Sequence, residues 1–187
     1  MKDFESLQKG NRGINWLQLA IAFVLLFITT LCLKIFFLGF YRVNSSSMNP
    51  TLQIGDMVLV DKFFFKQQKL KKNEIVYFHQ NNSNRDLVKR IIAFEGDTVL
   101  YLNDNIFINN YEYISKDEFD SSWLPNYHKI IVPKDNVFVI GDNLNVSSDS
   151  RDWGTVNIHN ILGKIVYIYF SKDDDSFHFD RIGNNLN

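Results

Sequence analysis

An uncharged, apolar run from Gly13 to Leu33 constrains this chain more than any other feature of its sequence. It reads GINWLQLAIAFVLLFITTLCL, and a helix needs about 20 such residues to cross the hydrocarbon core of a bilayer. Aromatic residues, which favour membrane interfaces, lie near both ends, with Trp16 at one and Tyr41 at the other. The sequence therefore predicts a transmembrane anchor over residues 13–40 and a separate body over residues 41–187.

A cleaved secretory signal is the alternative interpretation of such a segment. Its apolar core is about 7–15 residues long, and small residues flank the cut. The run in this chain is longer, and no site of that kind follows it. Lipoprotein-type processing at Cys32 is disfavoured as well, because Leu31 stands where a small residue is needed, so Cys32 is interpreted as a membrane-facing apolar residue. We expect an anchor that is not removed.

Positive charges near the ends of the anchor set its orientation, because they remain preferentially in the cytoplasm. Lys2, Lys9 and Arg12 precede the predicted anchor, whereas Arg42 and the later Lys62 lie on its other side, and the cluster before the anchor is the denser one. The sequence therefore predicts a cytoplasmic tail over residues 1–12 and a body outside the cytoplasmic membrane.

Composition excludes several classes of protein. The 187 residues are 22% charged and 45% hydrophobic, which excludes a disordered chain, and a net charge of −1 disfavours a nucleic-acid binder. A single cysteine cannot form an internal disulfide. We expect neither a metal nor a cofactor, because the four histidines lack the short spacing of metal ligands: His79, His128, His159 and His178.

The body alternates short apolar, β-branched runs with turn residues, which is typical of strands. No sustained 3.6-residue stripe follows residue 41. The sequence therefore predicts a mainly β, antiparallel fold. The expected strands are Asp56–Phe64, Glu74–Phe78, Leu87–Phe94, Thr98–Leu102, Ile106–Ile108, Asn136–Ile140 and Ile161–Phe170.

Four other segments of the body are expected to be turns or loops. Asn103–Asn105 has the composition of a hairpin turn, since Asn and Asp tolerate positive φ. Residues 110–130 are polar and aromatic without a period, and we expect a surface excursion there. Lys66–Lys72 predicts a solvated basic loop and Asp173–Asp175 an acidic turn.

The segment Asn44–Asp56, NSSSMNPTLQIGD, is the first of three that can carry chemistry. Three consecutive serines are typical of a flexible loop, and composition alone leaves that interpretation open. However, Pro50 stiffens the backbone just after them, and the segment follows closely on the predicted anchor. A hydroxyl beside a rigid turn in this position can serve as a nucleophile.

The second segment is Leu87–Asp97, LVKRIIAFEGD, in which Lys89 interrupts an apolar run. On a strand, Lys89 and Arg90 point to opposite faces, so one of them faces inward unless the strand lies at an edge. A lysine that snorkels from a half-buried strand is the structural alternative. An inward lysine has a lowered pKa because burial disfavours its charge, and a neutral amine near a serine is a general base.

The third segment is Gly141–Gly154, GDNLNVSSDSRDWG, which is rich in turn formers and is also compatible with a plain network of β-turns. Ser147, Asp149 and Arg151 alternate, so an extended backbone would place all three on one side. Such a set can hydrogen-bond a lysine amine and hold an Asp–Arg pair.

Together these segments resemble the type I signal peptidases of peptidase family S26. The serine motif of that family is similar to SSSMNPTL followed by GDMVLVDKF, its lysine motif to KRIIAFEGD and its third motif to GDNLNVSSDSRDWG. The tail FDRIG, Phe179–Gly183, is similar to the end of the family's sequences. The order of the motifs and the anchor before them match over nearly the whole chain.

The resemblance implies a role for each matched residue. It makes Ser47 the nucleophile and Lys89 the general base. It places the Ser45 hydroxyl beside the Ser47 N–H in the oxyanion hole, and it gives Ser147 the task of orienting the lysine amine. The ion pair Asp149–Arg151 is implied to brace the third motif.

The resemblance also implies the substrate and the fold. The substrate is the small-x-small stretch at the end of the signal peptide of a secretory preprotein, bound in extended form against strands of an antiparallel β body. The small P1 and P3 side chains of the substrate, and the chain that carries them, are expected to meet Val43, Met48, Leu52, Asp86 and Val88. The expected partners are secretory preproteins and the lipid bilayer.

The chain departs from the family's pattern in three ways. Asn44 stands where proline is common, and Leu144 stands where the third motif commonly has arginine. The middle of the chain is short, as in the compact members of the family.

Two rival functions remain open from the sequence alone. A self-cleaving repressor of the LexA-like type shares the Ser–Lys chemistry and the fold, but it needs a DNA-binding helical domain where this chain has its apolar run. A non-catalytic, membrane-tethered β domain is the other rival, and the presence of both Ser47 and Lys89 disfavours it.

Overall fold

The computed structural model describes residues 15–63, 69–81, 83–102, 105–114, 128–172, 176–183 and 186. The chain divides into two compact units, Met1–Phe36 and Phe37–Asn187. Of the segments predicted from sequence, the following lie outside the described residues: Asp173–Asp175, the turn residues Asn103 and Asp104, residues 66–68 of the basic loop, and Phe64 at the end of the first predicted strand.

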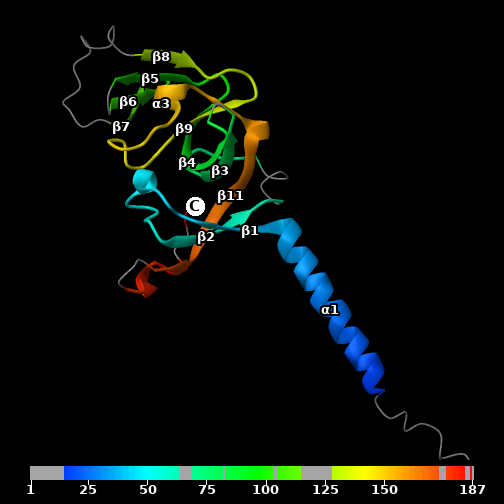
Figure 1. Ribbon diagram of the computed structural model, residues 1–187. Helices are drawn as coiled ribbons and strands as arrows, with labels where there is room; N and C mark the ends of the chain where they lie inside the picture. Colours follow the sequence, from blue (N-terminus) through cyan, green and yellow to red (C-terminus); the bar gives the residue numbers. More distant parts are fainter. Residues whose placement is uncertain are drawn as a thin grey trace, which may run out of the picture. The chain divides into compact units, whose positions relative to one another are not determined.

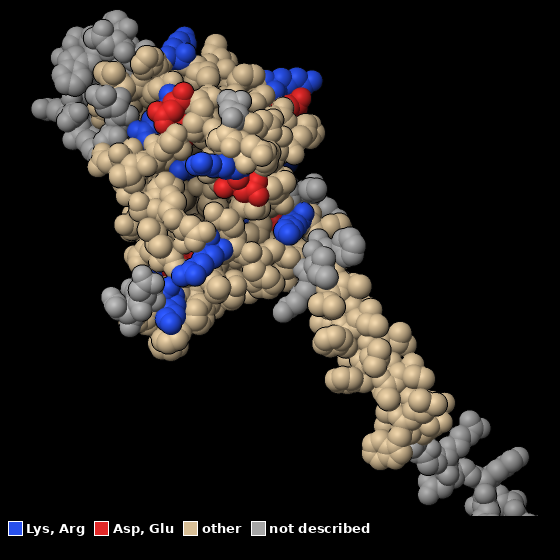
Figure 2. Space-filling view, in the orientation of Figure 1, with Lys and Arg blue, Asp and Glu red and all other residues tan. Residues whose placement is uncertain are grey.

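Helix α1 covers Trp16–Phe37. Its described side chains include no Asp, Glu, Lys or Arg, so its surface has a single colour in Figure 2. Within the described part of the chain, no helix combines the length and the apolarity required of a membrane span. The helix ends before residue 40, where the sequence placed the end of the anchor, because Leu38–Phe40 form backbone pairs with a neighbouring strand instead.

The larger sheet of the second unit has seven strands, and every neighbouring pair is antiparallel. Figure 1 shows the long strand β11, which pairs with β2 on one side and with β3 on the other. From one edge to the other the strands are β1 (Leu38–Arg42), β2 (Asp56–Asp61), β11 (Ile161–Ser171), β3 (Ile75–Gln80), β4 (Arg85–Phe94), β9 (Asn136–Ile140) and β10 (Val156–Asn157).

A smaller sheet has four antiparallel strands, in the order β7 (Tyr111–Ile114), β6 (Asn105–Ile108), β5 (Thr98–Leu102) and β8 (His128–Ile131). Strands β5 and β6 form the predicted hairpin, with Leu102 opposite Asn105. The surface excursion expected over residues 110–130 forms strands at both ends instead of loop, because β7 pairs with β6 and β8 pairs with β5. Residues 115–127 lie outside the described part.

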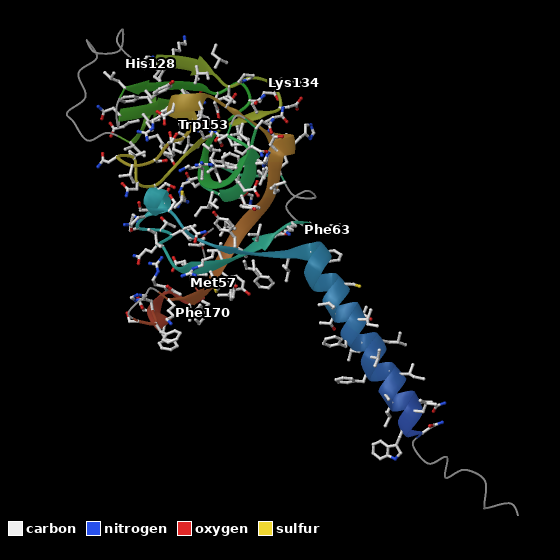
Figure 3. All side chains as sticks on the ribbon, in the orientation of Figure 1. Met57, Phe63, His128, Lys134, Trp153 and Phe170 are labelled. Atoms are coloured by element: carbon white, nitrogen blue, oxygen red, sulfur yellow. The ribbon has the colours of Figure 1, made fainter. Side chains whose placement is uncertain are left out.

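Four short helical turns complete the described unit: η2 (Ser46–Met48), α3 (Ser150–Trp153), η4 (Ile158–Asn160) and η5 (Phe179–Arg181). The prediction of a mainly β, antiparallel body is confirmed. In Figure 3, Trp153 marks the end of α3, and Met57 and Phe170 mark the pairing of β2 with β11.

Apolar side chains are buried on both faces of the larger sheet, because successive residues of a strand point to opposite sides. On β3, Ile75 belongs to one core cluster, whereas Val76 and Phe78 belong to another. The first cluster also contains Met48 and Leu52, which lie within the serine segment, after its three serines. A core therefore lies directly beneath the first of the three chemical segments.

Candidate active site

The serine segment folds into a tight turn that its own apolar residues anchor. Met48 is 2% exposed and Leu52 is fully buried, and the Leu52 N–H donates a hydrogen bond to the Met48 carbonyl (2.9 Å). Ser45 caps the turn η2, since its hydroxyl oxygen accepts a hydrogen bond from the Ser47 N–H (3.2 Å). The buried neighbours fix the backbone while Ser47 itself stays half-buried.

Asn143 ties this turn to the third segment. Its backbone N–H donates to the Ser47 carbonyl (2.9 Å), and its side-chain amide donates to the Ser46 carbonyl (3.2 Å). The sequence analysis missed this residue, because the third segment contains several turn-forming Asn side chains and nothing in their order marks the one that reaches across.

Lys89 lies in the middle of β4, opposite Val76 of β3. Its side chain is buried, and its Nζ donates a hydrogen bond to the Ser147 Oγ (2.9 Å). The alternation predicted for this strand is observed: Arg90 points to the other face, where its guanidinium forms a two-point pair with Asp142 (2.7 and 2.6 Å). The Arg90–Asp142 pair joins the second segment to the third and was not predicted.

The surroundings of Lys89 favour the neutral amine. The pKa of Lys89 is lowered to about 8, chiefly by burial and with a smaller contribution from the Arg151 guanidinium, while the Asp149 carboxylate opposes the shift. Taking an ammonium group out of water is costly, so desolvation is the dominant cause. At mildly alkaline pH this side chain can accept a proton, which an exposed lysine cannot do.

Asp149 and Arg151 form the expected ion pair, but the extended backbone considered from the sequence ends at Asp149, and Arg151 lies in a helical turn. Asp149 caps the first turn of α3 in a capping box with Asp152, and Arg151 lies within that turn. The Arg151 guanidinium donates to both carboxylate oxygens of Asp149 (2.9 and 3.1 Å) and to the Leu144 carbonyl (2.8 Å). The Asp149 cap explains why the backbone turns here, because a side chain that accepts N–H groups of the following residues favours a helical turn.

Gly141, in the third segment, lies where this segment meets the serine turn. A Cβ at this position would collide with the Ser147 hydroxyl and with the Ser47 carbonyl oxygen. The Gly141 N–H also donates to Asp149 (3.0 Å). The serine turn and Ser147, which binds the Lys89 amine, therefore approach each other over a single glycine. No side chain fits at this position.

The residues expected to meet the substrate lie on the face of β4 opposite Lys89. Val43 is buried in the first cluster with Met48 and Leu52, and Val88 packs against that cluster. Met48 and Leu52 are both buried members of the same cluster. Asp86 is exposed, and hydrogen bonds from the Tyr77 hydroxyl (2.6 Å) and His79 (2.8 Å) lower the pKa of its carboxyl group.

One edge of β4 is open next to this face. Along Arg85–Arg90 the strand pairs with β3, but on its other side β9 begins to pair only at Arg90. No described strand covers the outer edge of Arg85–Lys89. Such an edge can accept an extended peptide as an additional strand.

No cluster of three or more His, Cys, Asp or Glu side chains suited to a metal ion occurs among the described residues.

Comparison with known proteins gives one consistent family. Residues 14–170 match the family model described as signal peptidase, peptidase S26. The chain is 33% identical to signal peptidase IB of Staphylococcus aureus, over 89% of this chain and 94% of that protein. It is 30% identical to signal peptidase I of Bacillus caldolyticus, over 92% and 98%.

Among solved structures, a signal peptidase I from Enterococcus faecalis matches 52% of this chain and 97% of that one, at 25% identity with a TM-score of 0.41. The match to the family model covers most of the sequence, including all three segments that form the site. The chain thus belongs to the signal peptidase family S26 and is a serine peptidase of the signal peptidase I type.

Proposed function

We propose that this peptidase removes signal peptides from secretory preproteins by means of a Ser47–Lys89 dyad. The observation that carries the proposal is the environment of Lys89: a buried amine with a pKa lowered to about 8, held by Ser147 beside the serine turn. A serine hydroxyl is a weak nucleophile until a base takes its proton. A lysine can be that base only when it is neutral.

In the first half of the proposed reaction, the neutral Lys89 amine takes the Ser47 proton as the Ser47 Oγ attacks the carbonyl carbon of the scissile bond. The tetrahedral intermediate collapses when the resulting Lys89 ammonium gives that proton to the leaving amine, which is the new N-terminus of the mature protein. In the second half, Lys89 takes a proton from water, which then hydrolyses the ester to the signal peptide. The proton returns to Ser47, so that the enzyme is regenerated.

The oxyanion would be held by the Ser45 hydroxyl and the Ser47 N–H. In the substrate-free turn these two groups bond to each other at 3.2 Å, which is the long end of the range for such hydrogen bonds. A substrate carbonyl entering between them can accept from both, because the N–H loses only a weak partner and the hydroxyl proton is free to rotate. The resting turn is thus compatible with the proposed oxyanion hole.

The signal peptide would bind in extended form along the open edge of Arg85–Lys89, near the serine turn. The apolar, branched residues Val43 and Val88, above Met48 and Leu52, suit small P1 and P3 side chains. Bulky side chains would overfill such a space, at a cost of about 1–3 kcal/mol each. This is the basis for cleavage after small-x-small sequences, and Asp86 lies at the same edge as an additional contact.

We further propose that residues 13–40 include the membrane anchor, with residues 1–12 in the cytoplasm and catalysis at the outer surface of the cytoplasmic membrane. The support is the uncharged run in the sequence and the positive charges before it. In the catalytic unit itself, exposed aromatic side chains suit contact with a lipid interface: Phe40 is 49% exposed and contacts Tyr169 (5.1 Å between ring centroids).

The direct test is cleavage of a secretory preprotein by the purified full-length protein in detergent. Ser47→Ala and Lys89→Ala should each abolish processing while the protein remains folded, because nucleophile and base act as a unit. Ser46→Ala is the matched control and should remain active, since the Ser46 side chain is exposed at the neighbouring position. Near-normal cleavage by either dyad variant would remove the assignment.

A second test concerns the substrate. Replacing Ala by Leu at P1 of the preprotein should slow cleavage about tenfold or more, because the added volume has no space above the buried Met48 and Leu52. Equal rates for the two substrates would contradict the proposed pocket but not the dyad.

A further inference from the structure

A buried carboxylate lies outside the dyad and its supporting residues, at the start of β2. Asp56 is 0% exposed, and it accepts hydrogen bonds from the Ser171 hydroxyl (2.6 Å) and from the Gln53 N–H (2.8 Å). Burial by itself raises the pKa of the carboxyl, but the hydrogen bonds, led by those from Arg181, outweigh it and hold the pKa below its usual value. Asp56 is therefore a fully partnered anion in the interior.

The partner of Asp56 comes from the C-terminal end of the described chain. Arg181, in the turn η5, donates from Nε to Oδ1 (3.2 Å) and from Nη2 to Oδ2 (2.6 Å). The same Nη2 donates to the carbonyl oxygen of Thr51 (3.1 Å). One guanidinium thus binds both the carboxylate and the backbone of the loop that follows Ser47.

Asp56 also holds the other end of that loop. Its backbone carbonyl accepts the N–H of Val43 (2.8 Å), which lies just before the serines. The side chain of Asp56 and the Arg181 fork fix Thr51 and Gln53, which lie just after them. Asp56 and Arg181 therefore hold the two ends of the loop 43–56 together, and Ser47 lies within this loop.

The backbone that presents Arg181 is itself fastened to β11. The His178 N–H donates to the Ser171 carbonyl (3.1 Å), and the Gly183 N–H donates to the Ile168 carbonyl (2.8 Å). Arg181 has little exposed surface of its own, with a side chain that is 14% exposed. A guanidinium on a fixed backbone and with two hydrogen bonds to one carboxylate has a defined orientation, because the planar fork allows only one matching geometry.

We propose that Arg181 is a positioning residue for Ser47, which acts by locking the closure of the loop 43–56 through Asp56 and Thr51. It contacts neither the substrate nor the reacting atoms. Its effect is on the alignment of the nucleophile, and errors of about 1 Å in such alignment cost about 100-fold in rate. The inference rests on the proposed role of Ser47.

The test measures steady-state cleavage of a preprotein by full-length Arg181→Gln and Arg181→Lys in detergent. We expect kcat to fall about 10- to 100-fold in both, with KM changed less than about twofold. Arg181→Lys keeps the positive charge but loses the fork, so it should fail to restore kcat. The midpoint of the pH profile should not move in either variant, because Arg181 does not contact Lys89.

Asp180→Asn is the matched control, since this exposed carboxylate lies on the same turn and should be removable with wild-type kinetics. Thermal unfolding shows whether each variant is still folded. If Arg181→Gln does not fold, the kcat and KM of Arg181→Lys test the proposal alone, because lysine can still neutralise Asp56. A wild-type kcat in Arg181→Lys, or a loss confined to KM, overturns the proposal.

The same assay separates this proposal from the dyad. If wild-type protein cleaves, Ser47→Ala does not, and Arg181→Gln matches wild type, only the positioning role of Arg181 fails. If Ser47→Ala cleaves like wild type, the proposed function fails first.

Discussion

Ser47 and Lys89 contribute to the same site, yet different kinds of structure hold them. Lys89 lies within a ten-residue strand, paired along the β3 ladder and 3% exposed. Ser47 lies in a three-residue helical turn and is half-buried. The turn is fixed by hydrogen bonds from Asn143 to its carbonyls and by the buried Met48.

The difference follows from what each group has to do. A base made from lysine needs burial, because only desolvation brings its pKa toward neutrality. A nucleophile has to meet a substrate, so its backbone is fixed by buried neighbours while its side chain remains accessible. We expect changes around Lys89 to alter proton affinity and changes around Ser47 to alter geometry, and four measurements can break or sharpen this distinction.

The largest expected effect is that of Lys89→Arg. The guanidinium keeps the positive charge but does not lose its proton at any working pH, so it cannot act as the base. We expect kcat/KM to fall by about 10⁴-fold or more at every pH. Cleavage at more than about 1% of the wild-type rate would show that the lysine contributes charge rather than basicity.

Ser45→Ala addresses the geometry of the turn. Loss of one oxyanion donor typically lowers kcat by about 10²- to 10³-fold with little change in KM. Ser46→Ala, at the adjacent exposed position, is the control and should retain most activity. An effect of Ser45→Ala confined to KM would place this hydroxyl in substrate binding instead.

The pH dependence of kcat/KM reports on Lys89 directly. Its pKa is lowered to about 8, and its protonated form is inactive as a base. The rate should therefore rise about tenfold per pH unit below that value and level off in mildly alkaline solution. A rate that is flat from acid to alkaline pH would exclude Lys89 as the group that takes the Ser47 proton.

The smallest expected effect is one on stability, and its sign is opposite to that on activity. Lys89→Met should raise the free energy of unfolding at pH 7 by about 1–3 kcal/mol, because the native state then no longer buries an ammonium group. Between pH 8 and about 10.4 the unfolded wild-type chain binds more protons at residue 89 than the native state does, so wild-type stability rises with pH.

The advantage of Lys89→Met should accordingly be largest below pH 8 and fade toward pH 10. Urea unfolding at pH 7 and pH 10 checks both parts of this expectation. A destabilised Lys89→Met protein at pH 7 would mean that packing around the amine matters more than its desolvation.

Much of the fold could be predicted from local sequence. Each predicted strand with a clear apolar, β-branched run is present, since such residues pack well on the pleated, half-buried surface of a sheet. Strands β7 and β8 were missed because their outer residues are polar or exposed, and their pairing with β6 and β5 supplies what their composition does not indicate.

In the site, too, residues with a local sequence pattern could be predicted, and residues held by long-range contacts could not. Strand alternation predicted that either Lys89 or Arg90 faces inward, without saying which, and spacing predicted the Asp149–Arg151 pair, although the backbone between them is a capped turn. Asn143 and Arg181 could not be predicted, because their partners lie 97 and 125 residues away in the sequence. Long-range hydrogen bonds from ordinary polar side chains leave no local pattern.

Those separations have a consequence for the life of the newly made protein. Ribosomes add about 5–20 residues per second, from the N-terminus onward. Ser47 and Lys89 are both synthesised well before Ser147, which holds the amine, and Arg181, which closes the serine loop. For about 5–20 s a nascent chain thus carries Ser47 and Lys89 without these contacts, so on the proposed mechanism we expect the peptidase to stay inactive until its own synthesis is almost finished.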